Sequence, residues 1–96
     1  PLEATLRWGD GAAIDLTGAT VVFSLRKATT GELVVNRAPA AVLDPLAGVV
    51  QYRWQAGDLA EPDTYYGEFE VLLPDGNVVT VPNDTYLVVR VVPDLG

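Results

Sequence analysis

Carboxylates are the only potentially reactive side chains that this sequence contains in number. It has 13 Asp and Glu residues but no His and no Cys. Glu68 and Glu70 lie two residues apart, and Asp58, Glu61 and Asp63 form the densest acidic cluster. Clustered carboxylates can bind calcium, and two carboxyl groups about 5–10 Å apart across a cleft can hydrolyse a glycosidic bond.

Neither chemistry is well supported by the surrounding residues. A calcium loop gathers several oxygen ligands around a turn glycine, and a glycosidase needs a sugar-binding groove. We therefore expect residues 58–63 to form a solvated loop. We expect Arg90 to be the ion-pair partner of Glu68 and Glu70, in a surface contact worth less than ~1 kcal/mol.

The absence of His and Cys excludes most other enzyme classes. Histidine is the commonest general base and a frequent ligand of transition metals, and the cysteine thiolate is both a nucleophile and a metal ligand. Without them the sequence offers neither a Ser-His-Asp triad nor a zinc site. We predict that the protein is not an enzyme, binds no metal or cofactor and has no small-molecule substrate.

The net charge of -7 bears on the choice of partner. Residues 54–96 contain eight acidic residues and a single base, Arg90. Such a surface repels phosphate groups, so we expect neither nucleic acid nor an anionic membrane as a partner. No apolar run has transmembrane length, and no signal peptide is evident. A start at Pro1 fits a chain whose initiator Met was removed in a cytoplasm, with a domain excised from a longer chain as the alternative.

Short alternating apolar and polar runs, separated by Gly, Pro, Asn and Asp, fill the chain and predict strands rather than helices. The expected strands are residues 2–8, 13–16, 19–27, 33–37, 40–43, 49–54, 64–73, 78–81 and 86–92. Pro39 and Pro45 limit residues 40–43 to a short edge strand, because proline lacks the N–H donor. Seven to nine strands with short connections predict an all-β, immunoglobulin-like antiparallel β-sandwich that forms a single domain over residues 1–96.

The alternation also predicts which side chains form the core. The expected inward positions are Leu2, Ala4, Leu6, Trp8, Val21, Phe23, Leu25, Val50, Tyr52, Trp54, Tyr65, Gly67, Phe69, Val71, Leu87, Val89 and Val91. Tyr65, at the entry of the strongest strand, fits a tyrosine corner whose hydroxyl bonds to upstream backbone, with a plain core aromatic as the alternative. Pro74 and Gly76 predict a hairpin turn, since proline presets one φ angle and glycine accepts a positive one.

The outward side of the strongest strand is the candidate interaction surface. If its neighbour is the last strand, Tyr66, Tyr86 and Val88 form an exposed apolar patch among charged side chains. Tyrosine-rich patches of this kind are typical of protein interfaces, although single exposed apolar residues are also ordinary. We predict that this face binds another protein.

Several motifs, taken in order, resemble the N-terminal domain family of the phage baseplate upper protein. Residues 15–26 read Asp-Leu-Thr-Gly-Ala-Thr-Val-Val-Phe-Ser-Leu-Arg, which resembles the opening of that domain. Residues 48–54 resemble its Gly-x-Val-x-Tyr-x-Trp strand, and residues 64–69 resemble its Thr-Tyr-x-x-Glu-Phe strand. The hairpin at residues 75–76 and Pro82 also match, whereas Asp63 stands where the family usually has glycine.

The resemblance implies an immunoglobulin-like module of phage tails and baseplates that is attached to other virion structural proteins. It implies no catalytic residues. The expected function is therefore that of a structural protein in a virion assembled in the host cytoplasm, with self-association into a symmetric oligomer left open. A bacterial surface or adhesin module is the alternative, and a small hydrolase is disfavoured by the missing His and Cys.

Overall fold

The computed structural model describes residues 1–59, 62–81 and 87–91. These residues form seven strands and contain no helix. The strands are β1 (Leu2–Thr5), β2 (Thr20–Lys27), β3 (Leu33–Asp44), β4 (Val49–Tyr52), β5 (Asp63–Leu72), β6 (Val78–Val81) and β7 (Leu87–Val91). Every strand pairing is antiparallel, which confirms the all-β antiparallel prediction. Accordingly, the described part of the chain has no helical segment that could span a membrane.

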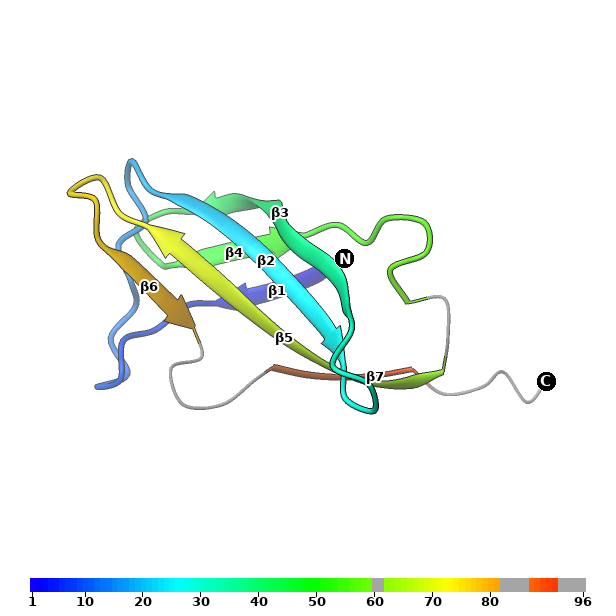
Figure 1. Ribbon diagram of the computed structural model, residues 1–96. Helices are drawn as coiled ribbons and strands as arrows, with labels where there is room; N and C mark the ends of the chain where they lie inside the picture. The colour runs from blue at the N-terminus through cyan, green and yellow to red at the C-terminus, as the bar shows by residue number, and fades with distance from the viewer. Residues whose placement is uncertain (60–61, 82–86, 92–96) are drawn as a thin grey trace.

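The strands form one curled sheet in the order β1-β4-β3-β2-β5-β6 (Figure 1). β7 also pairs with β5, opposite residues 63–67, whereas β6 pairs opposite residues 69–72. β6 and β7 thus share the edge of β5 that faces away from β2. On the other side of β2 the sheet curls back through β3, β4 and β1, so that β4 and β1 lie behind β2 and β5 in the view of Figure 1.

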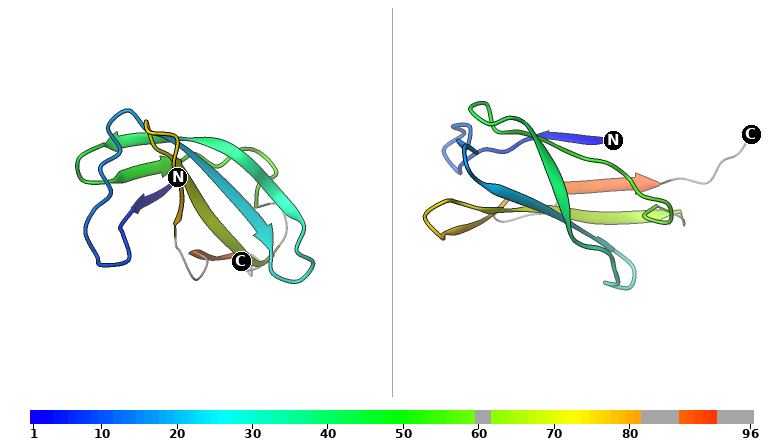
Figure 2. Two further views of the ribbon diagram at one scale, coloured as in Figure 1. Left: turned by 60° about the vertical axis from the view of Figure 1, so that its left-hand side comes forward. Right: turned by 90° about the horizontal axis from the view of Figure 1, so that it is seen from above.

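β3 is the strand that joins the two halves of the sheet. Its first part pairs with β2, up to Ala40 opposite Val21, and its last part pairs with β4, from Ala41 opposite Gln51. The right-hand view of Figure 2 shows β3, in green to teal, passing across the other strands between the two halves. The division of this segment into residues 33–37 and 40–43 was wrong. Pro39 is tolerated because the chain there has only β2 as a neighbour.

A bulge in β3 accompanies this change of partner. A step of two residues along β2, from Phe23 to Leu25, corresponds to a step of three along β3, from Ala38 to Val35. β3 therefore contains one extra residue here. Arg37 has a positive φ of 53°, and its N–H donates to the Ser24 hydroxyl at 3.0 Å. The Ser24 hydroxyl thus accepts from a backbone donor at the irregular part of the ladder.

The core lies between the two halves of the curled sheet. Its buried apolar side chains are Leu6, Ile14, Leu16, Val21, Phe23, Leu25, Val35, Val50, Tyr52, Tyr65, Phe69 and Val71. Phe23 lies at the centre of the aromatic packing, with ring centroids 4.7 Å from Tyr52, 4.9 Å from Phe69 and 6.0 Å from Trp54. The predicted inward faces of β2, β4 and β5 are confirmed by this burial.

Trp8 and Gly67 differ from the other positions predicted to point inward. Trp8 was expected in the core but is 39% exposed, because the chain leaves the β1 direction in a turn closed by the Trp8 N–H to Ala12 carbonyl hydrogen bond. Gly67 does occupy the inward face of β5, where an added Cβ would lie 3.0 Å from the Phe23 ring. The glycine therefore leaves room for the central aromatic side chain.

The loops before β2 and before β4 are fixed by side-chain and backbone hydrogen bonds. The Asp15 carboxylate accepts from the Thr17 hydroxyl at 2.7 Å and from the Thr17 N–H at 2.9 Å, and these bonds lower the pKa of Asp15. The Leu16 N–H donates to the Pro45 carbonyl, which ties this loop to the β3–β4 turn. Gly18 and Gly48 both have positive φ angles. These contacts account for the Asp-Leu-Thr-Gly motif and for the glycine that opens the motif at residues 48–54.

The predicted hairpin between β5 and β6 is confirmed. Gly76 has a φ of 92°, and the Leu73 N–H donates to the Asn77 carbonyl at 2.8 Å. The Asp75 carboxylate accepts from the Asn77 N–H, as expected for a turn stabilised by an aspartate.

Candidate protein interface

The candidate interface lies on the outward side of β2 and β5. Tyr66 is directly opposite Arg26, and Glu68 is directly opposite Ser24. Arg26 is in turn paired with Leu33 at the start of β3. Residues on one side of neighbouring strands meet in this way because side chains alternate along each strand. Three strands therefore contribute to one surface.

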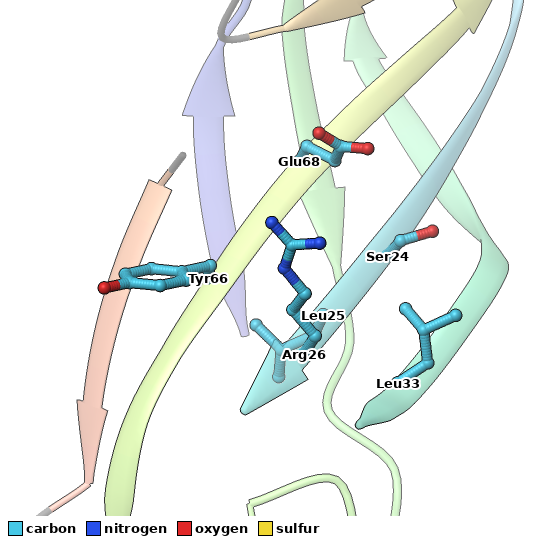
Figure 3. Close-up of a pocket in the computed structure, with 6 residues that line it drawn as sticks. All are labelled: Ser24, Leu25, Arg26, Leu33, Tyr66 and Glu68. Atoms are coloured by element: carbon cyan, nitrogen blue, oxygen red, sulfur yellow. The ribbon is translucent and has the colours of Figure 1, made fainter. Parts of the chain in front are cut away.

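These side chains surround a small hollow of about 70 Å³. Figure 3 shows Arg26, Ser24 and Glu68 along β2 and β5, with Leu33 on the β3 side and the Tyr66 ring extending from β5 toward β7. Binding pockets for small molecules usually measure about 300–1,000 Å³. A hollow of this size fits part of one protruding side chain of a partner protein rather than a separate ligand.

The surface around the hollow combines an aromatic ring, an exposed aliphatic side chain and charges of both signs. Leu33 is 54% exposed, and Tyr66 is half-buried. Arg26 and Glu68 provide the two charges beside them. Tyrosine and arginine are enriched in protein interfaces, where an apolar centre is surrounded by polar groups.

An ion pair borders this surface on the side toward β6. The Arg37 guanidinium reaches across β2 and contacts the Glu70 carboxylate. The expected partner of Glu70 was Arg90, but the backbone of Arg90 pairs with Thr64, six residues earlier on β5. The expectation for Glu70 was wrong because the register of β7 places it beside the opposite end of β5.

Of the three residues predicted for the interface, the structure describes the side chain of Tyr66 and the backbone of Val88. Tyr66 is on the outward side of β5, beside the hollow. The backbone of Val88 pairs with Tyr66, as expected for adjacent strands, whereas Tyr86 lies outside the described residues. Sequence reasoning missed Arg26 and Leu33. Their positions opposite one another depend on the register of the β2–β3 hairpin, which the sequence alone did not provide.

The acidic segment 58–63 differs from the solvated loop expected of it. Asp58 is only 9% exposed, and its Oδ2 accepts from the Tyr52 hydroxyl at 2.6 Å and from the Gln55 N–H at 2.8 Å. Asp63 accepts from the Thr29 hydroxyl and from the Thr64 N–H. Glu61 lies outside the described residues. The prediction was wrong for Asp58 because a buried tyrosine hydroxyl lies within reach of its carboxylate.

Burial raises the pKa of Tyr52 to about 12, with further contributions from the hydrogen bond to Asp58 and from its negative charge. Because the pKa in an unfolded chain is about 10, the unfolded chain loses this proton first as the pH rises. The contribution to stability is therefore complete below about pH 10 and is lost on the way to about pH 12.

We expect this titration to remove about 2 kcal/mol from the free energy of unfolding between pH 10 and pH 12. Urea unfolding curves recorded across this range would measure the loss. Tyr52→Phe has no hydroxyl to titrate, so its stability should fall less steeply over the same range. Equal slopes for the two proteins would contradict the role given to the Tyr52–Asp58 contact.

Metal chemistry finds no support in the described residues, where no three His, Cys, Asp or Glu side chains are placed to hold an ion together. The acidic side chains there instead accept hydrogen bonds from nearby turns and strands, as Asp15, Asp58 and Asp75 do.

The chain is similar to a known protein family. A family model described as the BppU N-terminal domain matches residues 2–90. No curated protein and no solved structure matches the chain at a significant level. The matched range includes all the motifs on which the resemblance was based.

Proposed function

The chain belongs to the BppU N-terminal domain family, a phage baseplate upper protein family, and on this premise we propose that it is a non-catalytic structural domain of a phage baseplate. It acts through contacts with other proteins of the virion. The family match over residues 2–90 is the observation that carries this proposal. It also favours a virion component over a bacterial surface module.

The domain organisation follows from the same premise. Residues 1–96 form a single domain. The two halves of the curled sheet correspond to the two layers of an immunoglobulin-like sandwich and enclose the core. The continuous passage of β3 from one half to the other supports one folding unit. The domain reaches its place by assembly with its neighbours in the host cytoplasm.

The outward side of β2 and β5 is the contact surface in this proposal. Tyr66 and Leu33 provide its apolar part, and Arg26 and Glu68 provide charges that fix the orientation of a partner. The acidity of the chain supports a protein partner over a nucleic acid.

The test is incorporation into particles. Phage that encode a Tyr66→Ala, Leu33→Ser variant should contain at least about tenfold fewer copies of this chain per particle, as quantitative mass spectrometry of purified virions would measure. Truncation of two central contact residues commonly costs more than about 1.4 kcal/mol of binding, which is tenfold in affinity.

The matched control is Leu43→Ser, which removes another exposed leucine from the far end of β3. It should leave incorporation unchanged, and thermal melts should establish that all the variants fold. Wild-type copy number for the double variant would overturn the choice of surface. Absence of the chain from wild-type particles would overturn the proposed function itself.

A further inference from the structure

A second and larger depression lies where β3 separates from β4. It has a volume of about 350 Å³ and is lined by residues from both strands and from the segment after β4. The two strands are paired from Ala41 opposite Gln51 onward, whereas earlier residues of β3 pair only with β2. The part of β3 before Ala41 and the chain after Gln51 are no longer paired with each other. The depression is the groove between these two segments.

The groove has a distinct chemical character. Its β3 side is small and apolar, formed by Ala38, Pro39 and Ala41. Its other side is formed by Gln51, Tyr52, Arg53 and Gln55. Among the lining residues Arg53 has the only charge, although the whole chain has a net charge of -7. The residues that line the groove thus include one positive charge and no carboxylate.

The polar side of the groove is held in place by the buried Asp58. The Asp58 carboxylate binds the Gln55 N–H and the Tyr52 hydroxyl, and the Asp58 N–H donates to the Gln55 carbonyl at 3.1 Å. The Gln55 side-chain amide donates to the Arg53 carbonyl at 3.1 Å. A groove whose wall is fixed before binding loses less conformational entropy when a ligand binds.

We propose that this groove binds a short extended segment of a partner protein that carries a carboxylate side chain. The small residues of β3 leave room for the backbone of the segment, and Arg53 pairs with its carboxylate. Regular addition of a strand to β3 is hindered by the bulge at Arg37 and by Pro39, which has no N–H donor. Recognition therefore depends on side-chain contacts and charge.

The inference goes beyond the proposed function, since it defines a second surface and the chemistry of its partner. It rests on that function only in taking the partner to be a neighbouring virion protein. The experiment uses isolated peptides, so its failure leaves the particle-incorporation test unaffected.

The experiment is a titration of the full ¹⁵N-labelled chain with the peptide acetyl-Thr-Glu-Val-Glu-Thr-amide, followed by NMR. Matched peptides have Gln or Lys in place of both Glu residues. The acidic peptide should shift the amide signals of residues 38–41 and 51–55, and its affinity should fall as salt is added. The Gln peptide should bind about fivefold more weakly, and the Lys peptide more weakly still.

Two variants and one control test the assignment of residues. Arg53→Gln should weaken binding of the acidic peptide by about fivefold, and Ala41→Glu should weaken it further by placing a like charge in the groove. Arg7→Gln, which removes an exposed charge from the loop after β1, should bind like the wild type.

Several results would overturn the proposal. Equal shifts from the acidic and lysine peptides, shifts outside the groove, or no binding would each do so. Self-association of the chain that Arg53→Gln abolishes would overturn the assignment to a separate partner, because the acidic segment would then come from a second copy.

Discussion

Replacing Gly48 by alanine should lower the free energy of unfolding by about 3–5 kcal/mol, more than backbone strain alone would cost. Gly48 has a φ of 71°, and an added Cβ would lie 2.7 Å from the Leu6 carbonyl oxygen and 3.0 Å from that of Ile14. Both neighbours are backbone atoms of segments held by backbone hydrogen bonds, so they cannot move aside without disturbing those bonds.

The Gly48→Ala substitution should disturb the backbone hydrogen bonds of Leu6 and Ile14. The Leu6 N–H donates to the Gly48 carbonyl at 2.8 Å, and the Ile14 N–H donates to the Leu6 carbonyl at 2.9 Å. Leu6 and Ile14 are both buried, so a shift of their backbone also disturbs the core. In thermal unfolding the loss corresponds to a midpoint lower by roughly 15–30 °C for a domain of this size.

Gly31→Ala is the matched control for backbone strain alone. Gly31 has a φ of 75°, close to that of Gly48, but an added Cβ would meet no atom within 4 Å. It should cost about 1–2 kcal/mol, the penalty for a left-handed conformation with a side chain. Similar losses for the two variants would contradict the role of close packing at Gly48.

Asp58→Ala should lower the free energy of unfolding by about 3 kcal/mol. Two donors, the Tyr52 hydroxyl and the Gln55 N–H, converge on one oxygen of this carboxylate. Tyr52 is only 3% exposed, so little water can replace the lost acceptor. Urea unfolding at neutral pH would measure the effect.

Asp58→Asn separates the acceptor from the charge. Its amide oxygen can occupy the position of Oδ2 and accept both hydrogen bonds, so the loss should be about 1 kcal/mol. The pKa of Tyr52 should also move back toward its ordinary value, because the negative charge is gone. Equal destabilisation by alanine and asparagine would indicate that the charge, rather than the pair of hydrogen bonds, is what matters.

The sequence was a good guide to the parts of the fold that depend on local alternation. The inward positions of Val21, Phe23 and Leu25 follow from the period of two, and they are buried as predicted. The Pro74–Gly76 turn was also predictable, because its conformation depends on residues within the turn itself. Local features of this kind need no knowledge of which strands are neighbours.

The continuity of β3 was not predictable in the same way. Proline usually ends a strand, and Pro39 suggested two short strands. It is accommodated because β3 changes partner from β2 to β4 just after this position, so one side of the strand has no ladder to interrupt. That circumstance is a property of the whole topology.

In the candidate sites, too, some residues could be predicted from the local sequence and others depend on the topology. Tyr66 was identified from its place in an alternating strand, whereas Leu33 and Arg26 join it only through the register of a hairpin. Asp58 was predicted to be solvated, because nothing in the local sequence indicates that the Tyr52 hydroxyl approaches it. The groove lined by Arg53 depends on the separation of β3 from the chain after β4, which no local sequence pattern indicates.

The passage of β3 through both halves of the sheet also determines how the domain transmits mechanical force. A pull on the β1–β4 half reaches the β2–β5 half through β3, which is hydrogen-bonded to β2 along its first part and to β4 along its last part. The halves cannot slide apart by separating their side chains alone, since β3 would have to break from one of its partners. When force is applied to its two halves, such a domain therefore behaves as a single stiff link.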